Sequence, residues 1–253
     1  MHEVPQEAEH KEGKVKNDTS AQALQKGRSA KGLAVMRVVA AIAAPLIMGA
    51  ILFGAAGRLD WVMGWIYVAV SSVGYGYSTL TMSPELAAER GGFHEGVKDW
   101  DKMLVGISGL CSPLGTLIVA GLDFRNGWSP APALAPQLAA LGFFILSYVL
   151  FNWAIAANAY FSKFVRIQKD RGHSVVTSGP YRYCRHPGYV ARIVEALATP
   201  VLLGSLWALI PAALCVGTFI IRTAMEDRTL QDELEGYTDY ARRVRYRLLF
   251  GVW

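Results

Sequence analysis

Long apolar runs with almost no charged residues constrain this chain more than any other feature. They cover about residues 33–57, 61–82, 103–122, 136–161 and 188–221. Each is long enough to cross a hydrocarbon core of about 30 Å as an α-helix. Apolar residues of a soluble core would instead be spread through the chain among polar ones. The chain is therefore predicted to be all-α, a polytopic membrane helical bundle.

The last of these runs is too long for one ordinary span. Pro200, Gly204 and Ser205 interrupt it near its middle. The interruption predicts two tightly connected helices over about 188–203 and 206–221, which brings the bundle to about six transmembrane helices. Both spans are short, so one or both are expected to be tilted or partly immersed. A single bent helix is the alternative.

The distribution of positive charge predicts the orientation of the bundle. The chain has 25 Lys and Arg among 253 residues and a net charge of +5. These cations concentrate in the N-terminal tail, in the loops 83–102 and 163–187, and after residue 221. Loops rich in Lys and Arg stay in the cytoplasm, so both termini are predicted to be cytoplasmic. A bacterial inner membrane is the expected location. The cations form no nucleic-acid stripe, so membrane lipids are the expected partner of the basic residues and nucleic acid is not.

The domain organisation follows from the same pattern. Residues 1–32 are polar and bury too little surface to offset chain entropy, so a disordered cytoplasmic tail is predicted there. Residues 33–253 form the predicted membrane domain. Within it, the charged stretch Thr223–Arg247 is predicted to be helical and to emerge into the cytoplasm. The three cysteines show no metal-ligand spacing, so no metal site is expected, and the oligomeric state stays open.

A short polar segment, GPYRYCRHPGYV from Gly179 to Val190, precedes the last apolar run. Polar aromatic and cationic residues are costly at the mouth of a membrane helix, which predicts a functional site. Pro187 suits the opening of the next helix, with His186 near the N-cap. The N–H groups of that helix end, with Arg185 and His186, are expected to attract an anionic group. An interfacial aromatic and basic belt is the alternative.

A second polar group lies at the end of the last run. Arg222 and Glu226 are four residues apart and share one helix face. A carboxylate at the membrane boundary can attract a cationic ligand or accept bonds from ribose hydroxyls. A solvated helix with internal ion pairs is the alternative. Arg192 and Glu195, inside the last run, are predicted to pair with each other or to line a substrate entrance.

The order of these elements resembles the isoprenylcysteine carboxyl methyltransferase and phospholipid methyltransferase superfamily of integral membrane enzymes. The shared features are a GxYxxxRHPxY element from Gly179, a helical hairpin, a helix that carries Glu226, and a YxxYxxRV ending from Tyr237. The resemblance spans about residues 161–253. The chain departs from the family at Ala191, where many members have glycine.

The resemblance implies S-adenosylmethionine as the methyl donor, bound on the cytoplasmic side by about residues 161–253. It implies that Arg185 lies nearest the transferred methyl group and the acceptor. The residues implied to line the cofactor pocket are Tyr181, His186, Pro187, Tyr189, Arg222 and Glu226. The closed apolar bundle favours a lipophilic small molecule or lipid that arrives from the bilayer. The atom of the acceptor that is methylated is left open. A carboxylate acceptor needs no base, an amine acceptor needs a base such as Glu226, and a thiol acceptor needs its thiolate to be stabilised.

Two other functions are weighed against the methyltransferase. Membrane sterol-type reductases use NADPH and resemble this C-terminal pattern, but they typically read RHPNYFGE where this chain reads RHPGYVAR. The loss of both the Asn and the Glu argues against a reductase. A non-catalytic transporter or scaffold would place polar residues through the bilayer midplane, whereas here they gather at one end of the runs.

Overall fold

The structure is a computed structural model. The chain divides into two compact units. The units are residues 1–40 and 41–253. The predicted disordered tail lies outside the described residues, except for residue 32 at its end. The residues that the structure describes are 32, 34–92, 94–248 and 253. In the first unit these are helical, and the second unit contains the elements that position the candidate site.

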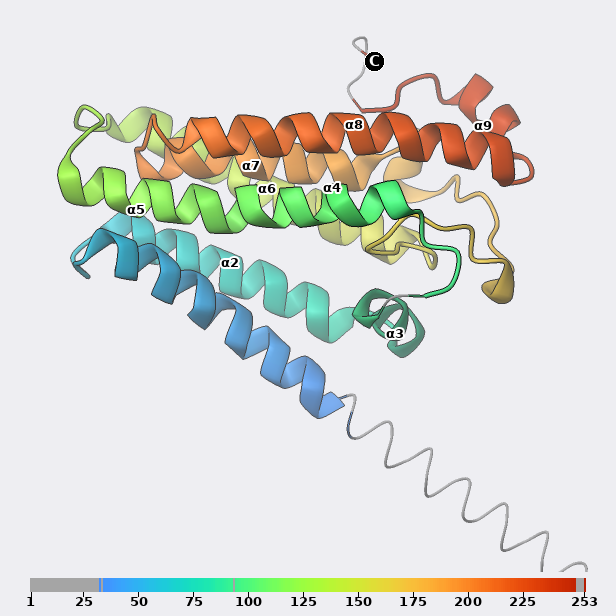
Figure 1. The fold of residues 1–253 in the computed structure, drawn as a ribbon, viewed down its shortest axis with the longest axis horizontal. Helices are drawn as coiled ribbons and strands as arrows, with labels where there is room; N and C mark the ends of the chain where they lie inside the picture. The colour runs from blue at the N-terminus through green and yellow to red at the C-terminus, as the bar shows by residue number, and fades with distance from the viewer. Residues whose placement is uncertain (1–31, 33, 93, 249–252) are drawn as a thin grey trace, which may run out of the picture. The chain divides into compact units, whose positions relative to one another are not determined.

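Every regular element in the described part of the chain is a helix, which confirms the all-α prediction. The helix Ala34–Ala56 is followed by elements that Figure 1 labels in chain order. These are α2 (Val62–Thr81), α3 (Pro84–Gly91), α4 (Asp99–Gly109), the π-helical η1 (Leu110–Gly115), α5 (Thr116–Asn126), α6 (Leu134–Ala157), the short 3₁₀ turns η2 (Lys169–Arg171) and η3 (Gly179–Arg182), α7 (Pro187–Leu203), α8 (Leu209–Glu233) and α9 (Tyr237–Arg243).

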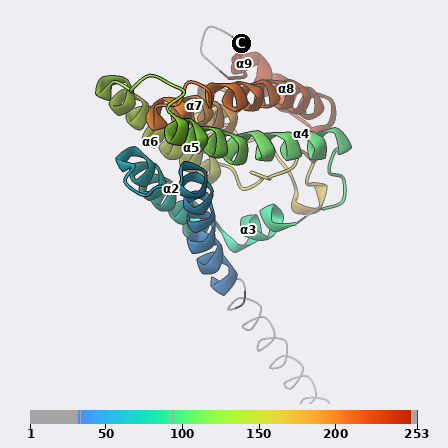
Figure 2. The same cartoon turned by 60° about the vertical axis from the view of Figure 1, so that its left-hand side comes forward.

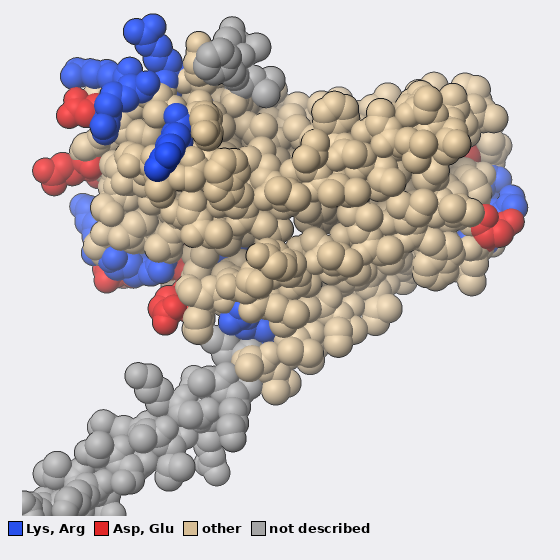
Figure 3. Space-filling view, turned by 180° about the vertical axis from the view of Figure 1, so that it is seen from behind, with Lys and Arg blue, Asp and Glu red and all other residues tan. Residues whose placement is uncertain are grey.

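Four helical stretches are long and apolar enough to cross a membrane. They are Ala34–Ala56, Asp99–Asn126, Leu134–Ala157 and Leu209–Glu233. On the face seen in Figure 3, the charged side chains gather mainly at one end of the molecule and a smaller group lies at the opposite end. The helices α2 and α7 form where spans are predicted but do not belong to these four stretches. The six-span topology therefore stays a prediction.

The last apolar run forms two helices, as predicted, and not one bent helix. α7 ends at Leu203 and α8 begins at Leu209. Gly204 ends α7 with a left-handed φ of 72°, and a Cβ there would lie 2.6 Å from Pro132. Both the backbone conformation and the space therefore require glycine. The turn lets α7 pack along α8, while α4 runs beside α8 in Figures 1 and 2.

Two helix boundaries differ from the predicted ones. α6 ends at Ala157, because the Asn158 side chain accepts a hydrogen bond from the Tyr160 N–H at 2.8 Å and turns the chain. α8 continues past residue 221 to Glu233, and within this extension Arg222 and Asp227 pair with residues of other elements. The predicted charged helix is then broken at Gly236, whose φ is 80°, so that α9 is a separate element.

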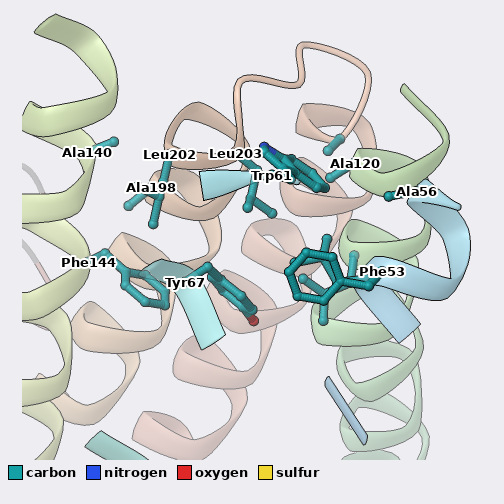
Figure 4. Packing of buried hydrophobic residues seen from close by; sticks show 13 residues of the cluster. Phe53, Ala56, Trp61, Tyr67, Ala120, Ala140, Phe144, Ala198, Leu202 and Leu203 are labelled. Atoms are coloured by element: carbon teal, nitrogen blue, oxygen red, sulfur yellow. The ribbon is translucent and has the colours of Figure 1, made fainter. Parts of the chain in front are cut away.

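The main apolar core joins helices that are distant in the sequence. Its members are Leu52, Phe53, Ala56, Trp61, Tyr67, Leu117, Ala120, Ala140, Phe144, Ala198, Leu202, Leu203 and Ala208, shown in Figure 4. Trp61 stacks on Phe124 with ring centroids 4.1 Å apart, and Tyr67 lies 5.3 Å from Phe144. This packing holds α2, α5, α6 and α7 together. The polar loop after α6 lies outside this cluster and forms the candidate site together with the start of α7 and the C-terminal half of α8.

Candidate functional site

Asp227 of α8 is fully buried and organises the polar end of the bundle. The Arg185 guanidinium binds it through two bonds, Nε to Oδ1 at 2.7 Å and Nη2 to Oδ2 at 3.0 Å. Its further partners are His186 Nε2 at 3.2 Å, Gln231 Nε2 at 2.8 Å, the Tyr237 hydroxyl at 3.0 Å and Arg247 Nε at 2.8 Å. One carboxylate therefore joins the RHP segment, α8 and the C-terminal segment.

Arg185 is held through its backbone as well as its side chain. Its N–H donates to the Tyr246 carbonyl at 2.9 Å, and the next N–H, of His186, donates to Arg247 at 3.0 Å. Nη1 of Arg185 donates to the carbonyls of Ala241, Val244 and Arg245. All three guanidinium nitrogens thus donate within the protein. The catalytic role predicted for Arg185 stays a prediction, and in this conformation the side chain is bound to Asp227.

Tyr189 of α7 and Glu226 of α8 face each other. The Tyr189 hydroxyl donates to Glu226 Oε2. The guanidinium carbon of Arg222 lies 5.3 Å from the centroid of the Tyr189 ring, and the rings of His186 and Phe219 each lie 5.8 Å from it. Among the described residues, no Lys or Arg forms an ion pair with Glu226. These side chains form a wall in which Tyr189 and Glu226 are half-buried and the Glu226 carboxylate makes no ion pair with a described residue.

Asp101 of α4 is the partner of Arg222, and the sequence did not predict it. Nε and Nη2 of Arg222 donate to Oδ1 and Oδ2 of Asp101 at 2.7 and 3.1 Å. The same carboxylate accepts the Val165 N–H at 2.8 Å, and Nη2 also donates to the Lys163 carbonyl at 3.1 Å. Asp101 is completely buried. The one sequence signal for it is an acidic residue at the start of an apolar run.

Glu89 of α3 makes a third buried ion pair. Arg166 donates to it from Nε at 2.8 Å and from Nη2 at 2.7 Å. The bond from Arg166 is the main cause that holds the pKa of the Glu89 carboxyl below its ordinary value. Arg166 also donates to Asp170 at 2.9 Å. The loop after α6 is therefore tied to α3, α4 and α8 by three buried carboxylates, those of Glu89, Asp101 and Asp227.

The predicted pocket residues fall into two groups. Tyr189, Arg222 and Glu226 meet, with the His186 ring beside Tyr189. Pro187 begins α7 and is buried, and His186 occupies the N-cap position, as predicted. Tyr181 lies in a separate buried cluster. There its hydroxyl accepts from Asn158 at 3.1 Å, and its carbonyl accepts from the Tyr240 hydroxyl at 2.8 Å.

Arg192 and Glu195 form the ion pair with each other that the sequence offered as one of two outcomes. They lie on α7, one turn beyond Tyr189. A separate apolar hollow opens at the other end of α8, lined by Val119, Trp128, Trp207, Ile210 and Pro211. It contains no titratable side chain, so the polar wall and not this hollow is the candidate site.

The loop between α6 and α7, which contributes Arg185 and His186, also contains a pH-sensitive group, His173. Burial, followed by the positive charges of Arg166 and Arg171, lowers the pKa of His173 from 6.5 to about 4. Its Nδ1 accepts the Gln168 N–H at 3.3 Å, and its ring centroid lies 4.5 Å from that of Tyr160. The unfolded chain therefore binds a proton at a higher pH than the folded one. The stability from neutral His173 is complete above about pH 6.5 and is lost as the pH falls towards about 4.

We expect the unfolding midpoint in detergent to fall across this window, and to fall less steeply in His173→Gln, which cannot take up that proton. Thermal unfolding followed at several pH values between 7 and 4 measures both slopes. Equal slopes for the two proteins would show that His173 is not the group that titrates.

Comparisons with known proteins match the part of the chain that carries this wall. Residues 140–232 match the model of the Isoprenylcysteine carboxyl methyltransferase (ICMT) family. The chain is 41% identical to a Protein-S-isoprenylcysteine O-methyltransferase of Schizosaccharomyces pombe over 70 residues, which cover 27% of this chain and 30% of the relative. It is 35% identical to one of Mus musculus over 101 residues, which cover 37% and 34%.

A third relative covers more of the chain. The Cobalt-zinc-cadmium resistance protein CzcN of Cupriavidus metallidurans is 30% identical over 137 residues, which cover 51% of this chain and 56% of the relative. The chain spans about a third of the length of the two methyltransferases above. These findings confirm the predicted resemblance to the superfamily. The matched residues include Arg185, Tyr189, Arg222 and Glu226, whereas Asp101 lies outside them.

Proposed function

We propose that this chain is an integral membrane enzyme that transfers a methyl group from S-adenosylmethionine to a lipophilic acceptor at the membrane boundary. One observation supports this most: the facing pair of Tyr189 and Glu226, with Arg222 beside it, lies within the segment that matches the ICMT family. The S. pombe and mouse relatives are named as O-methyltransferases of S-isoprenylcysteine. For this chain, the methylated group is a carboxylate, a thiol or an amine.

The side chains of the wall fit the donor molecule chemically. The Tyr189 ring already has the Arg222 guanidinium over it, and a sulfonium or ammonium cation suits an aromatic ring in the same way. The Glu226 carboxylate has no cationic partner among the described residues and suits an ammonium group or the ribose hydroxyls. Arg222 commits Nε and Nη2 to Asp101 and Lys163, which leaves Nη1 for a carboxylate. His186, Pro187 and Tyr181 complete the proposed pocket. When bound, S-adenosylmethionine supplies an electrophilic methyl group.

The chain's own residues would contribute mainly position and exclusion of water. The Asp227 network fixes the start of α7 against α8, so Tyr189 and Glu226 need no large rearrangement to receive a ligand. We propose Arg185 as the group nearest the transferred methyl and the acceptor, held in position by Asp227. A carboxylate acceptor is already anionic and needs no base. For an amine acceptor, Glu226 would accept the proton.

The proposal includes a topology. The four long apolar stretches are joined by α2 and α7 as shorter spans, with both termini and the C-terminal helix in the cytoplasm of a bacterial cell. The distribution of Lys and Arg along the chain supports this arrangement. The donor then reaches the wall from the cytoplasm, while the acceptor arrives from the bilayer.

Ligand-induced stabilisation of the purified protein tests the function. In detergent, S-adenosylmethionine and S-adenosylhomocysteine are expected to raise the unfolding midpoint, because a ligand at about 100 times its Kd adds about 2.7 kcal/mol to the folded state. NADPH serves as the comparison ligand and should leave the midpoint unchanged. Stabilisation by NADPH alone would contradict the methyltransferase and favour a reductase. Stabilisation by none of the three ligands would also contradict the methyltransferase.

The chemical class of the acceptor requires a labelled methyl group. Membranes that contain the protein should transfer label from the donor into an extractable lipophilic product, and membranes without it should not. A methyl ester releases its label in mild alkali, whereas a methylated amine or thioether retains it. The alkaline treatment therefore separates a carboxylate acceptor from the other two classes.

A further inference from the structure

A second cationic group lies beside the start of α7, outside the proposed donor pocket. The guanidinium carbon of Arg90, near the end of α3, lies 5.2 Å from the ring centroid of Phe161. That of Arg192, on α7, lies 5.8 Å from the ring centroid of Phe151. The two phenyl rings meet edge to face, with centroids 5.5 Å apart. These four residues form what we call the Arg–Phe cluster.

The charge of this cluster is not balanced. Arg192 pairs with Glu195, whereas Arg90 makes a bond of 3.2 Å from Nη1 to the Phe161 carbonyl. Within the described residues, no Asp or Glu forms an ion pair with Arg90. Burial, and then the positive charge of Arg192, lower the pKa of Arg90 to about 10. A guanidinium that is partly removed from water without a counter-ion is stabilised by a bound anion.

The cluster also adjoins the proposed donor wall. Phe161 packs so closely on Gly188 that a Cβ there would lie 2.7 Å from the ring. Gly188 is followed directly by Tyr189. α3 begins at Pro84, three residues after α2 ends at Thr81. In the proposed topology, the cluster therefore lies at the membrane boundary, at the depth of lipid head groups.

We propose that Arg90 and Arg192 bind the phosphate group of a membrane phospholipid. The two guanidinium groups come from separate elements and flank one pair of contacting phenyl rings, and a phosphate group offers oxygens enough to accept from both. Arg192 would bind it with the N–H groups that its bond to Glu195 leaves over. The acyl chains would lie on the exposed apolar faces of α2 and α6, which include Val73, Leu80, Leu146 and Val149. This site rests on the membrane location in the proposed function and not on methyl transfer.

Short-chain lipids added to the detergent-purified protein test the site. Dioctanoyl phosphatidylglycerol is expected to raise the unfolding midpoint, while dioctanoylglycerol, which lacks the phosphate, and inorganic phosphate are expected to leave it unchanged. Arg90→Gln and Arg192→Gln should each weaken the apparent affinity for the phospholipid by about tenfold or more, because each removes charge-assisted bonds. Arg228→Gln, which removes an exposed charge on α8, is the matched control and should keep the wild-type affinity.

The donor response shows whether each variant is folded. Arg90→Gln that still responds to S-adenosylmethionine but not to the phospholipid supports the site. Arg90→Lys keeps the positive charge and serves as a second variant in case Arg90→Gln does not fold. It should bind the phospholipid more weakly than the wild type does. A full phospholipid response in both glutamine variants would overturn the proposal. So would equal stabilisation by inorganic phosphate, or a loss of the donor response alone. If neither the wild type nor any variant is stabilised by S-adenosylmethionine, the proposed methyltransferase function is contradicted. The comparison of phospholipid binding between wild type and variants still tests the lipid site.

Discussion

Replacement of Asp227 by asparagine is expected to destabilise the folded protein by about 3–5 kcal/mol, or to lower its unfolding midpoint by about 10 °C. Asp227 is fully buried and is the common acceptor for Arg185, His186, Tyr237 and Arg247. An amide keeps the shape but removes the negative charge, so the buried Arg185 guanidinium is left without compensation. Thermal unfolding in detergent measures the effect directly.

Asp232→Asn on the same helix is the control for this change. Asp232 is largely exposed and lies 3.8 Å from Arg228, so the loss of its charge should shift stability by less than about 1 kcal/mol. Similar midpoints for Asp227→Asn and Asp232→Asn would show that the buried network does not hold the site together. If Asp227→Asn cannot be extracted from the membrane in folded form while Asp232→Asn can, this result also agrees with the large destabilisation expected for Asp227→Asn.

Replacement of Glu226 by glutamine is expected to weaken donor binding by about tenfold or more, with little change in stability. Glu226 accepts the Tyr189 hydroxyl and has no cationic partner among the described residues, so the folded protein does not depend on its charge. A ligand that offers an ammonium group or hydroxyls does depend on it, since bonds to a charged acceptor contribute about 1.5–3 kcal/mol. The measurement is the concentration of S-adenosylmethionine that gives half of the maximal thermal stabilisation.

Two further variants sharpen this comparison. Tyr189→Phe keeps the aromatic face but removes the hydroxyl that positions Glu226, so it should weaken donor binding less than Glu226→Gln does. Glu235→Gln removes an exposed carboxylate beyond the end of α8 and should bind the donor as the wild type does. Unchanged donor binding in Glu226→Gln would place the donor elsewhere and contradict the proposed wall.

The fold was largely predictable because a membrane helix can be identified from the composition of a short stretch of sequence. The apolar runs located the helices, and Gly204 located the hairpin turn between α7 and α8. The pairing of charges was not predictable in the same way. Asp101 is separated from Arg222 by 121 positions, nearly half of the chain, and no periodicity relates the two. Such partners are fixed by helix packing, which a single sequence does not reveal.

Asp227 shows the same difficulty at closer range. It stands next to Glu226 in a charged stretch that resembles a solvated helix. What buries it is the C-terminal segment, which folds back and contributes Arg247 and Tyr237. The sequence therefore placed Asp227 in the same polar cluster as Arg222 and Glu226, but it predicted neither the burial of this carboxylate nor its partners. The resemblance also implied that Arg185 lies nearest the acceptor, which stays a prediction, and in the structure Arg185 is paired with Asp227.

The folded-back C-terminal segment has a consequence for biosynthesis. Backbone bonds from Arg185 to Tyr246 and from His186 to Arg247 connect the start of α7 to residues that leave the ribosome after every apolar run. Chains are made from the N-terminus, and their parts assemble in that order. The bundle can thus insert into the bilayer before the wall acquires its final backing. If the wall binds the donor as proposed, a nascent chain would bind it only after its last positively charged stretch has emerged.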